Sequence, residues 1–132
     1  MVIRHFENIE RVLNGFRKII TQQTISKKTY TNKQGMISGE IEFADESVLS
    51  FMELKNTEHI EKKKYKYHYM DSNQSMIFRY DNAKHHPEVE TFPHHKHTTE
   101  GIGKSNEPEL IDVLTEIQER INKLDSTHKQ NK

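Results

Sequence analysis

Residues 64–81, KYKYHYMDSNQSMIFRYD, decide the fold because polar and apolar side chains alternate on both sides of a turn-forming stretch. Alternation with a period of two predicts β-strands, and the polar stretch MDSNQS between them predicts a β-hairpin. The apolar face of this hairpin comprises Tyr65, Tyr67, Tyr69, Met76, Phe78 and Tyr80. The opposite face, which is charged, comprises Lys64, Lys66, His68, Arg79 and Asp81.

Upstream of the hairpin the pattern changes from helix to strand. Phe6, Ile9 and Leu13 fall at helical spacing, which predicts an amphipathic helix over residues 3–13. Strands are predicted from β-branched or alternating residues over 19–31, 37–43 and 48–54. Both faces of the 48–54 segment are largely apolar, so we expect it to be a central strand.

Downstream, a second helix is predicted to begin after an N-cap at Ser105 or Asn106, with Pro108 in its first turn. Its apolar stripe comprises Leu110, Leu114, Ile117, Ile121 and Leu124. The expected fold is therefore α+β, an antiparallel sheet of about five strands flanked by an N-terminal and a C-terminal helix. We expect one domain over residues 1–125 and a polar tail over 126–132.

The composition limits the function classes. The 20 basic and 20 acidic residues cancel, so net charge gives no argument for nucleic acid or membrane. The absence of cysteine excludes disulfides, cysteine-ligated zinc and a thiol nucleophile, and is typical of a reducing cytoplasm. The first residues carry charges and no apolar run reaches membrane-spanning length. We expect a cytoplasmic protein that does not enter the membrane.

Residues 79–97, RYDNAKHHPEVETFPHHKH, are the richest in titratable groups and contain five of the nine histidines. Two X-Pro steps keep this segment extended, which predicts a structured loop lying over the sheet. Cleaving RNA without a metal requires a base, an acid and a cation that stabilises the phosphorane. The residues that could supply these groups are Glu53, His68, Arg79, Asp81, His85, His86, His94, His95 and His97. If its strand lies beside the hairpin, Glu53 is expected either to act as a base or to orient a histidine.

Each of these groups also has a structural interpretation. The tyrosine row is more often a buried aromatic face than a platform for RNA bases. Lysines around residue 64 either keep a strand edge solvated or follow a phosphate backbone. The candidate nucleic-acid-binding residues are Lys64, Lys66, Tyr67 and Lys96. Because the histidine spacing matches no standard zinc signature, we predict no metal site and no cofactor.

The segment YKYHYMDSNQSMIFRYDNAKHHPEVETFPHHKH, followed by a helix start at Pro108, resembles the TumE-like toxin family of prokaryotic toxin-antitoxin pairs. The sequence departs from this pattern at Lys84, where proline is expected. The resemblance implies a growth-inhibiting protein that acts on RNA and is neutralised by a cognate antitoxin. The matching residues are Tyr67, His68, Arg79, Asp81, Asn82, His85, His86, His94, His95 and His97.

Together these observations favour a toxin that is a metal-independent endoribonuclease. Two alternatives stay open: a non-catalytic growth inhibitor that binds nucleic acid or protein, and a metal-dependent hydrolase that uses the histidine loop. The stripe on the last helix fits a homodimer, an antitoxin-bound surface, or packing against the sheet.

Overall fold

The computed structural model describes residues 1–84 and 86–130, and for residues 125–130 only the backbone conformation. The chain begins with helix α1 (Val2–Gly15) and ends with helix α2 (Leu110–Gln130). Between them run β1 (Ile20–Thr29), β2 (Gln34–Phe43), β3 (Val48–Asn56), β4 (Lys64–Met70), β5 (Met76–Asp81), β6 (His95–Thr98) and β7 (Gly101–Lys104).

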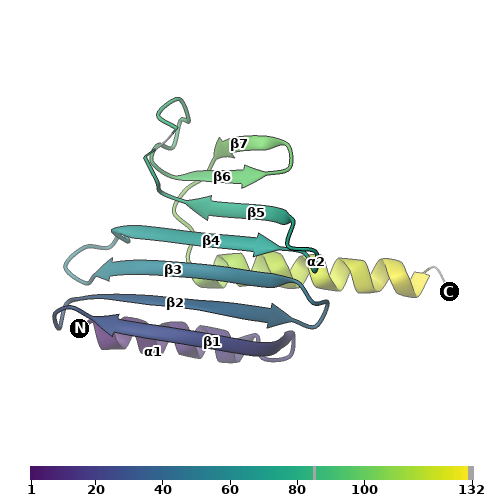
Figure 1. Cartoon of the computed structure of the whole chain (residues 1–132), viewed down its shortest axis with the longest axis horizontal. Helices are drawn as coiled ribbons and strands as arrows, with labels where there is room; N and C mark the ends of the chain where they lie inside the picture. The colour runs from purple at the N-terminus through teal and green to yellow at the C-terminus, as the bar shows by residue number, and fades with distance from the viewer. Residues whose placement is uncertain (85, 131–132) are drawn as a thin grey trace.

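The seven strands form one antiparallel sheet in which each strand pairs with its neighbours in the sequence, in the order β1 to β7. Figure 1 shows both helices on the same side of this sheet, α1 behind the β1–β2 end and α2 behind its middle. The contacts agree, because Phe6 of α1 lies against Gly35 of β2, where an added Cβ would come within 2.8 Å of the ring. The hydroxyl of Tyr80 in β5 donates to Glu116 in α2 at 2.6 Å. The sheet therefore has a helix-covered face and an open face.

The core lies between the helix-covered face and the two helices. Tyr65, Tyr67 and Tyr69 of β4 are at most 1% exposed, which confirms the structural interpretation of the tyrosine row. Burying a large apolar side chain contributes about 1.5–3 kcal/mol, so this row is a major part of the stability. The stripe of α2 from Leu110 to Ile121 is also buried, whereas Leu124 is about half exposed. Packing on the sheet thus accounts for the stripe, which no longer supports a homodimer.

Two features differ from the sequence prediction. The sheet has seven strands rather than about five, because residues 95–98 and 101–104 form a hairpin that continues it beyond β5. The prolines and glycines around these short segments indicated a loop and a turn, and pairing with β5 overrides that local preference. Helix α2 starts at Leu110, later than predicted, and continues to Gln130 through most of the expected polar tail. The division into a domain over 1–125 and a tail over 126–132 stays a prediction.

No helix in the described part of the chain is both long enough and apolar enough to cross a membrane.

A buried carboxylate joins α1 to the centre of the sheet. Glu53 of β3 is fully buried on the helix-covered face, where its Oε1 atom lies 2.7 Å from Nε2 of His5. Its Oε2 atom accepts a hydrogen bond from the Tyr67 hydroxyl at 2.6 Å. Burial raises the pKa of Glu53, but the hydrogen bond from His5, the charge of Lys62 and the hydrogen bond from Tyr67 together lower it below its usual value. Glu53 is therefore ionised in the folded protein.

We expect Glu53→Gln to destabilise the fold by about 1–3 kcal/mol at neutral pH, because it removes the charge that His5 and Tyr67 satisfy. In the wild type, the lowered pKa of Glu53 stabilises the fold above the unfolded-state pKa of about 4.3, and this stabilisation is lost as the pH falls through the folded-state pKa. Urea denaturation from about pH 3 to about pH 7 measures the free energy of unfolding of the variant and its pH dependence in the wild type.

The matched control is Glu42→Gln, at an exposed position of the neighbouring strand β2, where stability should change by less than about 0.5 kcal/mol. Equal losses in the two variants would contradict the role given to Glu53.

Candidate functional site

The register of β4, β5 and β6 places the charged residues of the hairpin in two rows across the open face. In the first row, His68 pairs with Arg79, and Arg79 pairs with His97. In the second row, Lys66 pairs with Asp81, and Asp81 pairs with His95. Since side chains alternate along a strand, these residues point away from the tyrosine row and the helices.

Asp81 is the centre of the second row. It is 5% exposed. Its Oδ1 atom lies 2.8 Å from Nε2 of His95 and accepts a hydrogen bond from the backbone N–H of Ala83 at 3.0 Å. Its Oδ2 atom accepts a hydrogen bond from Nε of Arg79 at 3.0 Å. Asp81 therefore pairs with Arg79 and fixes its side chain.

Arg79 links the two rows. Besides its bond to Asp81, its Nη2 atom lies 3.0 Å from Nε2 of His97. Arginine only donates, so Nε2 of His97 accepts this bond and its proton is on Nδ1. The Arg79 side chain is 35% exposed, which leaves part of the guanidinium facing solvent. The arrangement presents a fixed cation that can bind a phosphate.

The histidines on either side of Arg79 favour the neutral form. Burial lowers the pKa of His68 below its usual value, and the charges of Arg79 and Lys66 lower it further. Burial and then Arg79 also lower the pKa of His97, although Asp81 acts in the opposite direction. A neutral imidazole can take up a proton, so His68 has the protonation state of a general base at neutral pH.

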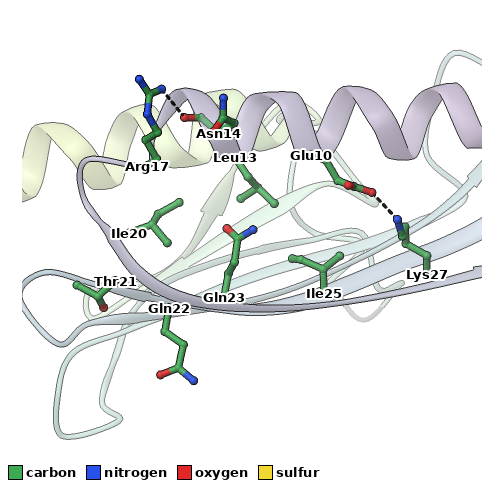
Figure 2. Close-up of a pocket in the computed structure, with 10 residues that line it drawn as sticks. All are labelled: Glu10, Leu13, Asn14, Arg17, Ile20, Thr21, Gln22, Gln23, Ile25 and Lys27. Atoms are coloured by element: carbon green, nitrogen blue, oxygen red, sulfur yellow. Dashed lines mark hydrogen bonds and ion pairs between the residues drawn. The ribbon is translucent and has the colours of Figure 1, made fainter.

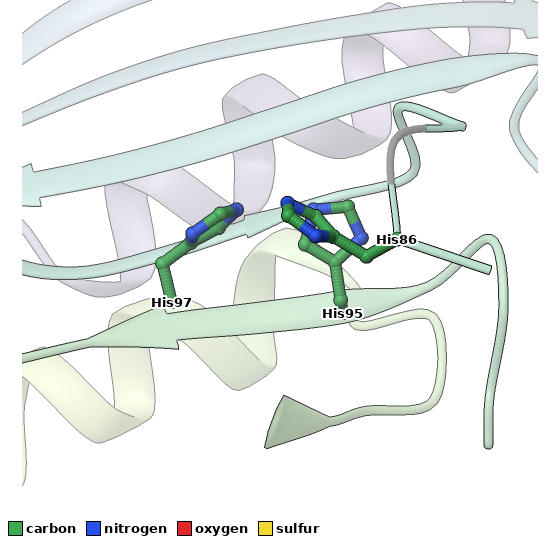
Figure 3. A group of neighbouring side chains, drawn as sticks. All are labelled: His86, His95 and His97. Atoms are coloured by element: carbon green, nitrogen blue, oxygen red, sulfur yellow. The ribbon is translucent and has the colours of Figure 1, made fainter. Parts of the chain in front are cut away.

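His86 joins this group from the segment between β5 and β6. Figure 3 shows His95 and His97 projecting from β6, with the His86 ring reaching them from a separate stretch of chain. The His86 ring lies 5.2 Å from the ring of His95 and 5.7 Å from that of His97, centroid to centroid. The residues that converge on the open face, called here the histidine face, are His68, Arg79, Asp81, His86, His95 and His97. His85, which was predicted to act with them, lies outside the described residues.

Two candidate catalytic residues lie elsewhere. Glu53 belongs to the helix-covered face and contacts His5. One of its predicted roles was to orient a histidine, but His5 is not a histidine of the site. His94 stacks on Tyr65, and its Nδ1 atom lies 2.8 Å from the tyrosine hydroxyl, on the same helix-covered side. The sheet separates both residues from the histidine face, because adjacent positions on a strand point to opposite sides.

The candidate RNA-binding residues divide in the same way. Lys64 and Lys66 are exposed on the open face beside His68. Tyr67 is fully buried and bonded to Glu53, so its ring offers no surface for stacking on a base. The Nζ atom of Lys96 is 2.9 Å from Glu116 and lies over the rings of Phe78 and Tyr80, on the helix-covered side. Only the first two lysines therefore accompany the histidine face.

Two partners were absent from the sequence-based prediction. His5 was not singled out, although it lies one turn before Ile9 on the buried side of α1, where a polar residue requires a partner. The pairing of Asp81 with His95 had no local signal, because it depends on β6 joining the sheet. Alternation along residues 95–98 indicates only that His95 and His97 share a face, and not which strand they join.

A groove elsewhere on the molecule offers different chemistry. Figure 2 shows it between α1 and β1, lined by Leu13, Ile20 and Ile25 and crossed by an ion pair of 2.6 Å between Lys27 and Glu10. No histidine lines it, and β1 is one edge of the sheet, whereas β6 lies next to the other edge. This groove therefore lacks the clustered imidazoles of the histidine face.

Comparison with known proteins identifies one family. The family model described as Toxin TumE matches residues 8–121, which include every strand and most of both helices. Searches of curated proteins and of solved structures give no significant match.

We expect the pKa of His68 to lie below the usual value of about 6.5, because burial and two nearby cations oppose its protonation. Replacing Lys66 by Gln removes one of these cations, so the pKa of His68 should rise. NMR titration of the histidine ring protons measures both values. The control is Lys64→Gln, on the same face two positions away, which should leave the pKa of His68 unchanged. A pKa of His68 above 6.5, or equal shifts in the two variants, would contradict this electrostatic description.

Proposed function

The chain belongs to the Toxin TumE family, and we propose that it inhibits growth by cleaving RNA without a metal ion. The observation that carries this proposal is the first row of the histidine face, where Arg79 lies between His68 and His97 on an open surface. A cation flanked by two imidazoles is the minimum set of groups for attack of a 2′-hydroxyl on the neighbouring phosphate.

The proposed reaction assigns one step to each group. His68, which is neutral, takes the proton of the 2′-hydroxyl as its oxygen attacks the phosphorus atom. The guanidinium of Arg79 stabilises the charge that develops on the phosphorane oxygens. A histidine in its protonated form, His86 or His97, gives its proton to the departing 5′-oxygen, and for His97 this is the minority form because its pKa is lowered. The products are a 2′,3′-cyclic phosphate and a free 5′-hydroxyl, so no water and no redox partner are consumed.

Two further residues act through Arg79 rather than on RNA. Asp81 and His95 are buried, at 5% and 2% exposure, so neither reaches a substrate. Asp81 receives the Nε–H of Arg79 and lies 2.8 Å from His95. We assign both a positioning role, since they hold the guanidinium in one orientation before RNA binds.

The charges around the site suit a polyanion. Lys64 and Lys66 extend from His68 along β4 on the open face. Asp81, the carboxylate of the two rows, is buried and paired with Arg79 at 3.0 Å, so it offers little repulsion to a phosphate at the surface. The lysines would bind phosphates on one side of the cleaved bond, with affinity that falls as salt is added.

As a family toxin, the chain is expected to act in the cytoplasm and to be neutralised by a cognate antitoxin. An antitoxin that covers the histidine face would prevent RNA from reaching Arg79. The two alternatives remain distinct from this proposal: a non-catalytic inhibitor, for which the histidine loop is only a structural clasp, and a metal-dependent hydrolase.

RNA cleavage by the purified protein in EDTA tests the proposal. We expect His68→Ala and Arg79→Ala each to lower the cleavage rate by about 10²-fold or more, because they remove the base and the phosphorane-stabilising cation. Cleavage fragments should carry 2′,3′-cyclic phosphate ends, which electrophoresis and mass spectrometry detect. The same variants should relieve growth arrest on expression.

The control is His59→Ala, an exposed histidine in the turn after β3 that is not one of the residues of the histidine face. It should retain full activity. Growth arrest that survives both site substitutions would favour the non-catalytic inhibitor, and cleavage that requires an added metal would favour the hydrolase.

A further inference from the structure

Three imidazoles meet where the segment after β5 crosses β6. The rings of His95 and His97 are 4.7 Å apart, and one ring nitrogen from each of His86, His95 and His97 lies within 4.8 Å of the others. His95 and His97 are two positions apart on a strand, so they share a face. His86 comes from the neighbouring segment (Figure 3). This combination of an i, i+2 strand pair and one loop residue has none of the sequence spacings of helix-borne or cysteine-based zinc sites.

The outer nitrogens of two of these rings already have partners. Nδ1 of His95 lies 2.9 Å from the carbonyl oxygen of Pro93, and Nδ1 of His86 lies 3.2 Å from Oε1 of Glu88. Both partners only accept, so the Nδ1 atoms carry the protons and donate. In neutral rings Nε2 then carries the lone pair. Histidines that bind metals almost always have this arrangement, with the second N–H donated to a carboxylate or a backbone carbonyl.

A carboxylate lies beside the three rings. Nε2 of His95 lies 2.8 Å from Oδ1 of Asp81. Nε2 of His97 also points toward this carboxylate, at 3.4 Å from its Oδ2 atom. The carboxylate of Asp81 therefore adds a negative charge beside the three ring nitrogens.

We propose that His86, His95 and His97 form a binding site for a divalent transition-metal ion of the Zn²⁺ class, with Asp81 as a nearby negative charge. Three imidazole nitrogens suit Zn²⁺ better than Mg²⁺ or Ca²⁺, which prefer oxygen ligands. An ion bound there takes the Nε2 lone pair of His97 that otherwise accepts from Arg79. Resting on the function proposed above, the site is inhibitory: metal binding removes His86 and His97 from acid-base chemistry and places a competing cation beside Arg79.

Calorimetric titration of Zn²⁺ into untagged protein stripped with a chelator tests the site directly. We expect one ion per chain, with affinity at least 10-fold weaker in His86→Ala and in His97→Ala, because each removes one of three ligands. His86 is partly exposed on a loop, so its substitution leaves the core intact, and thermal unfolding verifies this. His59→Ala is the matched control and should bind as the wild type does. Absence of stoichiometric binding, or equal affinity in His86→Ala and wild type, would overturn the site.

RNA cleavage by the same samples tests the inhibitory role separately. We expect cleavage by the metal-free wild type to stop when one equivalent of Zn²⁺ is added and to return with EDTA. In His86→Ala, whatever activity remains should be insensitive to the same concentration of Zn²⁺. Stoichiometric Zn²⁺ binding without any effect on cleavage would refute the inhibitory role but would support the metal site. If no form of the protein cleaves RNA, the proposed function fails, and calorimetry still decides the metal site.

Discussion

The two-residue period of β4 is the constraint on which the rest of the molecule depends. Because Tyr65, Tyr67 and Tyr69 occupy every second position, burying them under the helices forces Lys64, Lys66 and His68 onto the other face. Pairing with β5 and then β6 carries this separation across the sheet. Core and candidate site are thus two sides of the same strands, and a shift of one residue in register would exchange them.

Buried charge is handled differently on the two faces. On the helix-covered face, Glu53 pairs with His5 and accepts a hydrogen bond from Tyr67, and so joins α1 to the sheet. On the open face, Asp81 accepts a hydrogen bond from Arg79 and lies against His95. Arg79 itself remains partly exposed to solvent and contacts His97. The first carboxylate has its partners in a closed core and serves stability. The second holds a cation at a surface, which is the arrangement that binding or catalysis requires.

The sequence predicted those parts of the structure that depend on local periodicity. The α+β class, the amphipathic α1, the hairpin of β4 and β5, and the shared face of His68, Arg79 and Asp81 all follow from spacing along one or two segments. Long-range pairing was not accessible in this way. β6 is four residues long and flanked by proline and a turn, so only its pairing with β5 makes it a strand, and that pairing brings His95 and His97 to Arg79. Glu53 was a candidate on condition that its strand lies beside the hairpin. β3 does pair with β4, but Glu53 lies opposite Tyr65 and so faces the helices.

The position of β6 and β7 at the edge of the sheet separates the integrity of the site from that of the core. Both strands have four residues, and β7 is exposed along its whole length, so few buried contacts hold this hairpin. Segments of this kind open at a lower free energy than the core. Opening would withdraw His95 and His97 from Asp81 and Arg79 and leave the tyrosine row packed under the helices. We therefore expect this surface to open without unfolding of the core, and a ligand that binds only the assembled form would select it.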